Sequence, residues 1–339
     1  MKAIRIDEPK KVSFCEIDKP VRQKGEALLK ILYGGICGSD LGSYRGTFAY
    51  FSYPRVPGHE FSAEIVEIDE NTKGLKEGMI VTCNPYFNCG ECYSCKKGIL
   101  NACMDNQTMG VQREGAFSQY ITMPIERIYD GKGIDAKTLA TIEPFCIAYH
   151  GVTRGGVKKG DKVLVVGAGT IGVLSAVAAK ALGAEVWISD IAQGKLDIAK
   201  TFGVDGTILN SSKAAFEESV RNITDANGFD VTIEAVGLPS TFIDCIDAAC
   251  FGGHMVLVGV GKRNADFNFT LLQKKELNVY GSRNALEKDF LELIELVKNG
   301  DIPLDKIVTN TYKFDDAQKA FADFDSDTGK MLKVVIDFT

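Results

Sequence analysis

The span from Lys162 to Asp190 constrains the fold of this chain more than any other feature. It opens with the apolar run KVLVV, passes through the turn GAGTIG, and continues into an apolar stretch typical of a buried helix. Gly183 ends that stretch, and a second apolar run, VWIS, leads to Asp190. This order predicts a strand, a helix and a parallel strand, which is the repeating unit of an α/β domain.

The glycines of this turn complete the pattern G-x-G-x-x-G between a strand and a helix, in a unit of about 30 residues. The first glycine permits a tight turn, the second lets backbone approach a pyrophosphate, and the third brings the helix against the strand. The alternative is a glycine turn in an α/β protein without a cofactor. The residues predicted to bind the cofactor NAD here are Gly167, Gly169, Thr170, Ile171, Gly172 and Asp190. Further apolar strands at VTIEAV, MVLVGV and LNVYGS predict a doubly wound parallel sheet.

Ten cysteines are the second informative feature, because four of them share the spacing C-x2-C-x2-C-x7-C. These four are Cys89, Cys92, Cys95 and Cys103. The surrounding segment, residues 83–103, is too polar and glycine-rich to fold on burial alone, so we expect one structural zinc ion to hold it. A redox pair or unrelated thiols are the alternatives, but a redox pair requires a strand-to-helix context that this segment lacks.

A third group combines Cys37, on the glycine-flanked turn GICGSD, with His59 and Glu60 in VPGHEF, just before the predicted strand 61–68. A thiolate, an imidazole and a carboxylate form the mixed donor set of catalytic zinc sites. Taken singly, Cys37 could be a core residue and His59 a turn residue.

Composition excludes several classes of function. The formal net charge is -6 without a basic run, so the chain lacks the charge of a nucleic-acid binder. The uncharged stretch 163–179 is interrupted by glycines, so we expect no membrane span. A charged beginning, MKAIRIDEPKK, predicts a cytoplasmic protein. A length of 339 residues fits about two domains.

The order GICGSD, GHE, four cysteines, IEPF and GAGTIG resembles the zinc-containing medium-chain alcohol and polyol dehydrogenases over essentially the whole chain. The resemblance implies an α/β protein with a GroES-like, β-rich catalytic domain at residues 1–146. A Rossmann domain would follow at 147–283, and residues 284–339 would return to the catalytic domain. It also implies hydride transfer to NAD, one catalytic and one structural zinc ion per subunit, and a homo-oligomer, either dimer or tetramer.

Carried over to this sequence, the resemblance makes Cys37 and His59 ligands of the catalytic zinc. Glu60 and Glu143, the latter in IEPF, are candidate catalytic residues and ligands, and which one contacts the metal stays open. Ser39 would relay the proton of the alcohol. The family often has a histidine at the position of Gly42, so the end of the relay also stays open.

Lys333 matches a basic position that contacts the pyrophosphate in relatives; the alternative is a solvated charge at a sheet edge.

The segments FAYFSYPRVPGHE and GSRNALEKDF resemble sugar-acid dehydrogenases of the L-galactonate and L-gulonate 5-dehydrogenase type. The implied substrate is a hexonate, whose carboxylate and hydroxyls suit arginine and amide donors. The candidate substrate residues are Arg55, Phe87, Arg113, Phe117, Arg283 and Asn284. The alternatives are a neutral polyol or sugar phosphate, such as sorbitol, galactitol phosphate or butanediol, or a cofactor-binding regulator without turnover.

Overall fold

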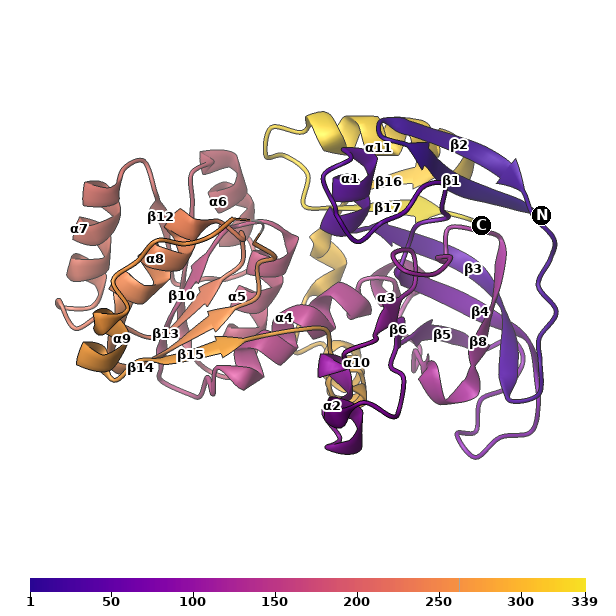
Figure 1. Ribbon diagram of the computed structural model, residues 1–339, viewed down its shortest axis with the longest axis horizontal. Helices are drawn as coiled ribbons and strands as arrows, with labels where there is room; N and C mark the ends of the chain where they lie inside the picture. Colours follow the sequence, from indigo (N-terminus) through magenta and orange to yellow (C-terminus); the bar gives the residue numbers. More distant parts are fainter. Residues whose placement is uncertain (262) are drawn as a thin grey trace. The chain divides into compact units, whose positions relative to one another are not determined.

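The computed structural model describes residues 1–261 and 263–339, which form two compact units. Residues Met1–Glu143 and Leu286–Thr339 form the first, here called the β-rich unit, and Pro144–Ala285 form the second, the α/β unit. Both ends of the chain, indigo and yellow in Figure 1, therefore belong to the β-rich unit. The resemblance placed the corresponding boundaries after residues 146 and 283.

The α/β unit is built on a six-stranded sheet in which all neighbouring strands are parallel. Its strands are, in sheet order, β12 (Gly206–Leu209), β11 (Glu185–Asp190), β10 (Lys162–Val166), β13 (Phe229–Glu234), β14 (Ala249–Leu257) and β15 (Asn278–Gly281). The chain starts at the centre, moves to one edge and then returns to build the other half. This order confirms the predicted doubly wound sheet.

Helices α5 (Thr170–Ala181), α6 (Gln193–Lys200), α7 (Lys213–Ile223), α8 (Pro239–Ala248) and α9 (Thr270–Lys275) pack on this sheet (Figure 1). The central strand β10 is buried from Val163 to Val166, as expected for a parallel strand covered on both faces. Helix α5 packs on β10 and β11, and its apolar residues from Val173 to Ala179 are buried there. The predicted strand, turn and helix are therefore the centre of this unit.

The β-rich unit contains a seven-stranded sheet whose longest strand, β3, pairs with β4, β8 and β17. Its strands are β16 (Val308–Lys313), β17 (Lys333–Asp337), β3 (Glu26–Ile36), β4 (Glu60–Ile68), β5 (Ile80–Cys83) and β9 (Ile128–Asp130), with β8 (Tyr120–Pro124) beside β3. Only β16 and β17 run parallel; the other pairs are antiparallel. Strand β17 brings the C-terminal segment directly against β3.

Short hairpins and helices complete the β-rich unit. The hairpins are β1 (Lys2–Glu8) with β2 (Lys11–Glu16), and β6 (Tyr86–Phe87) with β7 (Gln107–Thr108). The α-helices are α1 (Gly38–Tyr44), α2 (Tyr93–Lys96), α3 (Ala136–Leu139), α10 (Glu287–Lys298) and α11 (Ala317–Ser326), and the 3₁₀ turns are η1 (Leu100–Ala102), η2 (Ile125–Arg127), η3 (Leu304–Ile307) and η4 (Phe314–Asp316). Helix α4 (Ile142–Arg154) begins in the β-rich unit and continues into the α/β unit. Throughout the described ranges, every helix is too short or too polar to cross a membrane.

Gly172 is a packing requirement of the α/β unit. A Cβ atom at this position would lie 1.7 Å from the carbonyl oxygen of Gly167, whereas one at Gly169 would meet nothing within 4 Å. We expect Gly172→Ala to destabilise the protein by about 1 to 3 kcal/mol or more, because backbone must move to relieve the overlap. Gly169→Ala is the matched control and should unfold at the wild-type temperature. Equal unfolding temperatures for the two variants in calorimetry would contradict this account.

Candidate functional site

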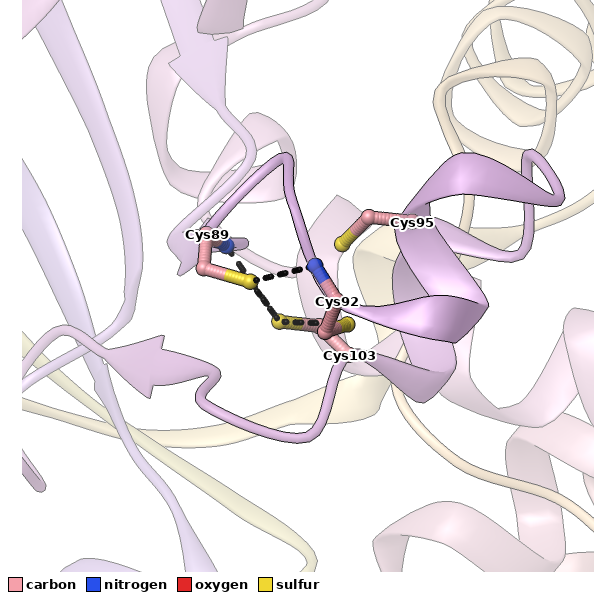
Figure 2. A group of neighbouring side chains, drawn as sticks. All are labelled: Cys89, Cys92, Cys95 and Cys103. Carbon is pink, nitrogen blue, oxygen red and sulfur yellow. Dashed lines mark hydrogen bonds between the residues drawn. The ribbon is translucent and has the colours of Figure 1, made fainter.

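The four cysteines of the predicted lobe converge in the loop between β6 and β7 (Figure 2). Their Sγ atoms all lie within 4.8 Å of one another. Backbone N–H groups already face the sulfurs: that of Cys89 donates to Cys103 Sγ at 3.2 Å, and that of Cys92 to Cys89 Sγ at 3.4 Å. Hydrogen bonds from the backbone of Met104 and Cys95 lower the pKa of Cys92 to about 6, which favours its thiolate. Four converging sulfur donors fit a tetrahedral structural zinc ion.

A second cluster lies where the end of β3 meets the start of β4 in the β-rich sheet. Cys37 follows β3, His59 precedes β4, and Glu60 is the first residue of β4. One ligand atom from each of these three side chains lies within 4.8 Å of the others. The carboxylate of Glu60 fits because its partner across the strands is Gly35, where a Cβ would come within 2.3 Å of Glu60 Oε2. Sequence-distant residues therefore supply one thiol, one imidazole and one carboxylate, a donor set that suits a catalytic zinc ion.

His59 is buried and only partly satisfied by protein atoms. Its Nε2 atom lies 3.4 Å from Ser39 Oγ, while its Nδ1 atom is buried without a hydrogen-bond partner. Burial alone would lower the pKa of His59, but the charges of Cys37 and Asp40 raise it well above the ordinary value. An imidazole that is buried, incompletely bonded and surrounded by anionic groups has the environment of a metal ligand.

Helix α1 positions both Cys37 and Ser39. The side chain of Asp40 accepts the backbone N–H of Cys37 at 2.9 Å, which closes the first turn of this helix. A Cβ at Gly42 would lie 3.1 Å from the Cβ of Phe48, so the chain packs Phe48 close to the position that often carries histidine in relatives. Ser39 is therefore the hydroxyl that the structure places beside His59.

Lys333 has a different place from the one expected. Its side chain is buried, and Nζ lies 2.8 and 2.6 Å from the two carboxylate oxygens of Glu60 and 3.2 Å from the carbonyl oxygen of Ile36. These contacts use the three donors of the ammonium group, so neither a pyrophosphate contact nor a solvated edge charge describes it. A lysine at the start of β17 is instead the counter-ion of a residue in the cluster.

Glu143 lies in the first turn of α4 and is buried. Burial raises its pKa to about 7, against the opposing effect of His59. Its Oε1 atom accepts a hydrogen bond from the hydroxyl of Tyr86. Nothing in the sequence indicates that Tyr86 contacts Glu143, because an aromatic residue in NPYF is equally typical of a strand. Glu143 is not part of the Cys37, His59 and Glu60 group within 4.8 Å.

The cofactor-binding candidates gather at the carboxyl edge of the α/β sheet. Gly167 has a φ of +106°, and Gly169 is the N-cap of α5, so Thr170 and Ile171 form the start of that helix. Asp190, at the end of β11, accepts the backbone N–H groups of Ala168 at 2.8 Å and Ala192 at 2.9 Å. The carboxylate thus ties the glycine turn to the next strand. The open space at Gly169 and the N-terminus of α5 fit a dinucleotide phosphate.

Three of the candidate substrate residues pack in or against the hydrophobic cores of the β-rich unit. Phe117 is completely buried, and its ring fills the space above Gly34 and Gly58, so it belongs to the core. Phe87 packs against the other hydrophobic core of this unit. The guanidinium of Arg113 stacks on the Phe87 ring, 3.7 Å from its centroid. Tyr86 and Phe87 are successive residues of β6 and point to opposite faces of it, so Phe87 and the stacked Arg113 face away from Glu143, which Tyr86 contacts.

The remaining substrate candidates are placed as follows. Arg55 is half-buried and donates from Nη2 to Ser52 Oγ at 2.6 Å. Arg283 and Asn284 follow β15 in the α/β unit, where Asn284 has a φ of +51°.

Comparison with protein-family models gives two matches. Residues 23–132 match the alcohol dehydrogenase GroES-like domain, and residues 170–299 match the zinc-binding dehydrogenase domain. Over 338 residues, the chain is 34% identical to L-galactonate-5-dehydrogenase of Escherichia coli K12, covering 100% of this chain and 99% of that protein. The chain belongs to the zinc-binding alcohol dehydrogenase family. The resemblance seen in the sequence is therefore confirmed, and the protein is an oxidoreductase of that family.

Two further comparisons show the breadth of this family. Sorbitol dehydrogenase of Halalkalibacterium halodurans is 32% identical over 326 residues, covering 95% of this chain and 94% of that protein. Among solved structures, one described as a short chain alcohol dehydrogenase from E. coli CFT073, complexed with NADH, aligns with a TM-score of 0.92 at 31% identity. That alignment covers 100% of this chain and 99% of the other.

We expect the two clusters to bind zinc with separable consequences. Metal analysis of the purified wild type should find two zinc ions per chain. Cys37→Ser should remain folded with one ion and lose activity. Cys103→Ser should lose folded protein, because structural zinc contributes about 10 to 16 kcal/mol of apparent binding free energy. A wild type with at most one zinc ion would contradict this assignment.

Removing Lys333 should destabilise the β-rich unit. Lys333→Met leaves the carboxylate of Glu60 buried without its counter-ion, which costs about 3 to 5 kcal/mol. Lys313→Met on the neighbouring strand β16 is the control, because Lys313 is 67% exposed where it pairs with Asp337. Urea unfolding should show a large loss for the first variant and little for the second. A Lys333→Met protein of wild-type stability with a raised KM for NAD would restore the pyrophosphate role.

Proposed function

We propose that this dehydrogenase oxidises a secondary alcohol of a hexonate-class sugar acid to a ketone and transfers the hydride to NAD. The observation that carries the proposal is the similarity to L-galactonate-5-dehydrogenase along the entire chain. The glutamate in IEPF supports it, because the branch of the family that acts on polyols and sugar acids resembles this chain at Glu143. The product is the corresponding keto acid, and the proton of the hydroxyl leaves to solvent.

In this proposal Cys37, His59 and one glutamate, Glu60 or Glu143, hold the catalytic zinc, and the four-cysteine lobe holds the structural one. Bound zinc lowers the pKa of a neighbouring hydroxyl, so the alcohol can lose its proton near neutral pH. Ser39 is the residue that accepts this proton, because its hydroxyl lies beside His59 at the cluster. With glycine at position 42, the proton continues from Ser39 to water or to the cofactor ribose.

The α/β unit supplies the hydride acceptor. The N-terminus of α5 and the glycine turn bind the pyrophosphate, while Asp190 accepts hydroxyls of the adenosine ribose. A carboxylate at that place repels a 2'-phosphate, by about 4 kcal/mol for unit charges 4 Å apart at a surface-like dielectric, which favours NAD over NADP. The protein positions the carbinol carbon against the nicotinamide, and the redox chemistry belongs to the cofactor.

A neutral polyol is the second candidate substrate. The full-length similarity to a sorbitol dehydrogenase favours it. The stacking of Arg113 on Phe87 also favours it, because this guanidinium then faces away from Glu143 and is not available to bind a substrate carboxylate there. Arg283 and Asn284 are then the remaining candidates for binding a substrate carboxylate.

A substrate panel distinguishes the two. Catalytic efficiencies are compared for L-galactonate, L-gulonate, sorbitol, galactitol and ethanol with NAD. A charge-assisted contact contributes about 1.5 to 3 kcal/mol, so an aldonate should exceed the matching polyol by about tenfold or more. Arg283→Met should reduce that preference without lowering the efficiency for sorbitol. A neutral polyol ahead of every aldonate would refute the sugar-acid proposal and leave the zinc chemistry in place.

The predicted homo-oligomeric assembly and cytoplasmic location stay predictions of the sequence. Light scattering of the purified protein measures the first.

A further inference from the structure

Arg127 is the last residue of η2, and its side chain contacts β6, the strand that leads from Tyr86 toward the cysteine lobe. Its Nη1 atom donates to the carbonyl oxygen of Tyr86, and its Nη2 atom donates to Asn88 Oδ1 at 3.0 Å. Between these two bonds its guanidinium lies 4.5 Å from the ring centroid of Phe87. One side chain therefore contacts three consecutive residues, the last of which directly precedes Cys89.

This contact is unusual in its charge balance. Burial lowers the pKa of Arg127, and within the described chain no carboxylate lies within salt-bridge distance of it. A desolvated guanidinium without an acidic partner costs free energy that an uncharged side chain of similar length would avoid. The guanidinium is planar and presents several N–H donors in a fixed arrangement, so it can bind two acceptors at once. The guanidinium is thus suited to fixing geometry rather than to adding stability.

The geometry that Arg127 fixes reaches Glu143 through Tyr86. Alternate side chains of a strand point to opposite faces, so Phe87 meets Arg127 while Tyr86 points the other way. There its hydroxyl donates to Oε1 of Glu143. Because one oxygen of Glu143 is bound in this manner, the carboxylate is held in one orientation.

We propose that Arg127 is a positioning residue that holds Tyr86 against Glu143 and fixes the entry to the cysteine lobe. The inference rests on the proposed function, in which Glu143 acts at the catalytic zinc. Arg127 thereby connects the two metal-site candidates. Asn88, which it binds, directly precedes Cys89 of the lobe, and Tyr86, which it also binds, donates a hydrogen bond to Glu143. Arg127 belongs to neither site and contacts no candidate metal ligand in the described structure.

A double-mutant cycle tests the inference. If Arg127 acts through Tyr86, then Arg127→Met and Tyr86→Phe should each lower kcat by about tenfold to a hundredfold, the range of a lost hydrogen bond to a charged group. The double variant should be no slower than the slower single variant. KM for NAD should stay unchanged in all three. Additive losses in kcat would overturn the proposal.

Arg113→Met is the matched control. Arg113 stacks on the same ring of Phe87 but donates to neither Tyr86 nor Asn88 among the described contacts, so its loss should leave kcat within about twofold of wild type. A drop equal to that of Arg127→Met would show that stacking on Phe87, rather than the bonds to Tyr86 and Asn88, is what matters. Arg127→Lys keeps the charge but loses the fork, and it should behave as Arg127→Met does. It replaces that variant if Arg127→Met does not fold.

A readout without substrate separates this inference from the proposed function. A chelator that reports released zinc should remove zinc faster from Arg127→Met than from wild type or Arg113→Met, because the entry to the lobe is loosened. Unchanged release together with unchanged kcat would overturn the inference. A wild type that retains two zinc ions but oxidises nothing in the substrate panel would instead count against the proposed function, and the release rates would still decide the role of Arg127.

Discussion

The buried ion pair between Glu60 and Lys333 is the contact on which the candidate catalytic cluster depends. It joins β4 to β17 across β3, between residues 273 positions apart in the chain. The pair is almost fully removed from solvent, so losing either partner would strand a charge in an apolar environment. The C-terminal segment therefore stabilises the cluster, because it carries Lys333, the cation that balances the carboxylate of Glu60.

Three glycines leave room for bulky side chains at and near the cluster. Gly35 leaves room for the carboxylate of Glu60, and Gly34 and Gly58 leave room for the ring of Phe117. Gly58 has a φ of +100°, a conformation that other residues rarely adopt, and it lies directly before His59. The turn that positions the imidazole of His59 therefore needs a backbone conformation that glycine adopts easily. The ring of Phe117 packs against this turn at Gly58.

Burial and neighbouring charges shift the pKa values of Glu143 and His59. Glu143 is raised to a pKa of about 7 because water is excluded from it, while neighbouring anions keep His59 basic. A buried group whose pKa is strongly shifted by specific neighbours is a candidate functional residue. A dehydrogenase must remove one proton for each hydride, so this environment suits the chemistry of the family. The hydroxyl of Tyr86 donates to Glu143, and the hydroxyl of Ser39 lies 3.4 Å from Nε2 of His59.

The sequence by itself determined the parts that depend on local pattern. Apolar strand periodicity and the glycine turn predicted the doubly wound sheet, because parallel strands are buried on both faces. The spacing of Cys89 and Cys103 with the two cysteines between them predicted the lobe, because all four ligands lie in one short segment. Only the tertiary structure decided the parts that depend on residues distant in the chain. It paired Lys333 with Glu60, set Tyr86 against Glu143, and placed the ring of Phe117 in the core. The physical reason is that a buried charge or ring takes the partner that strand register brings to it, and register between distant strands is not encoded in any single motif.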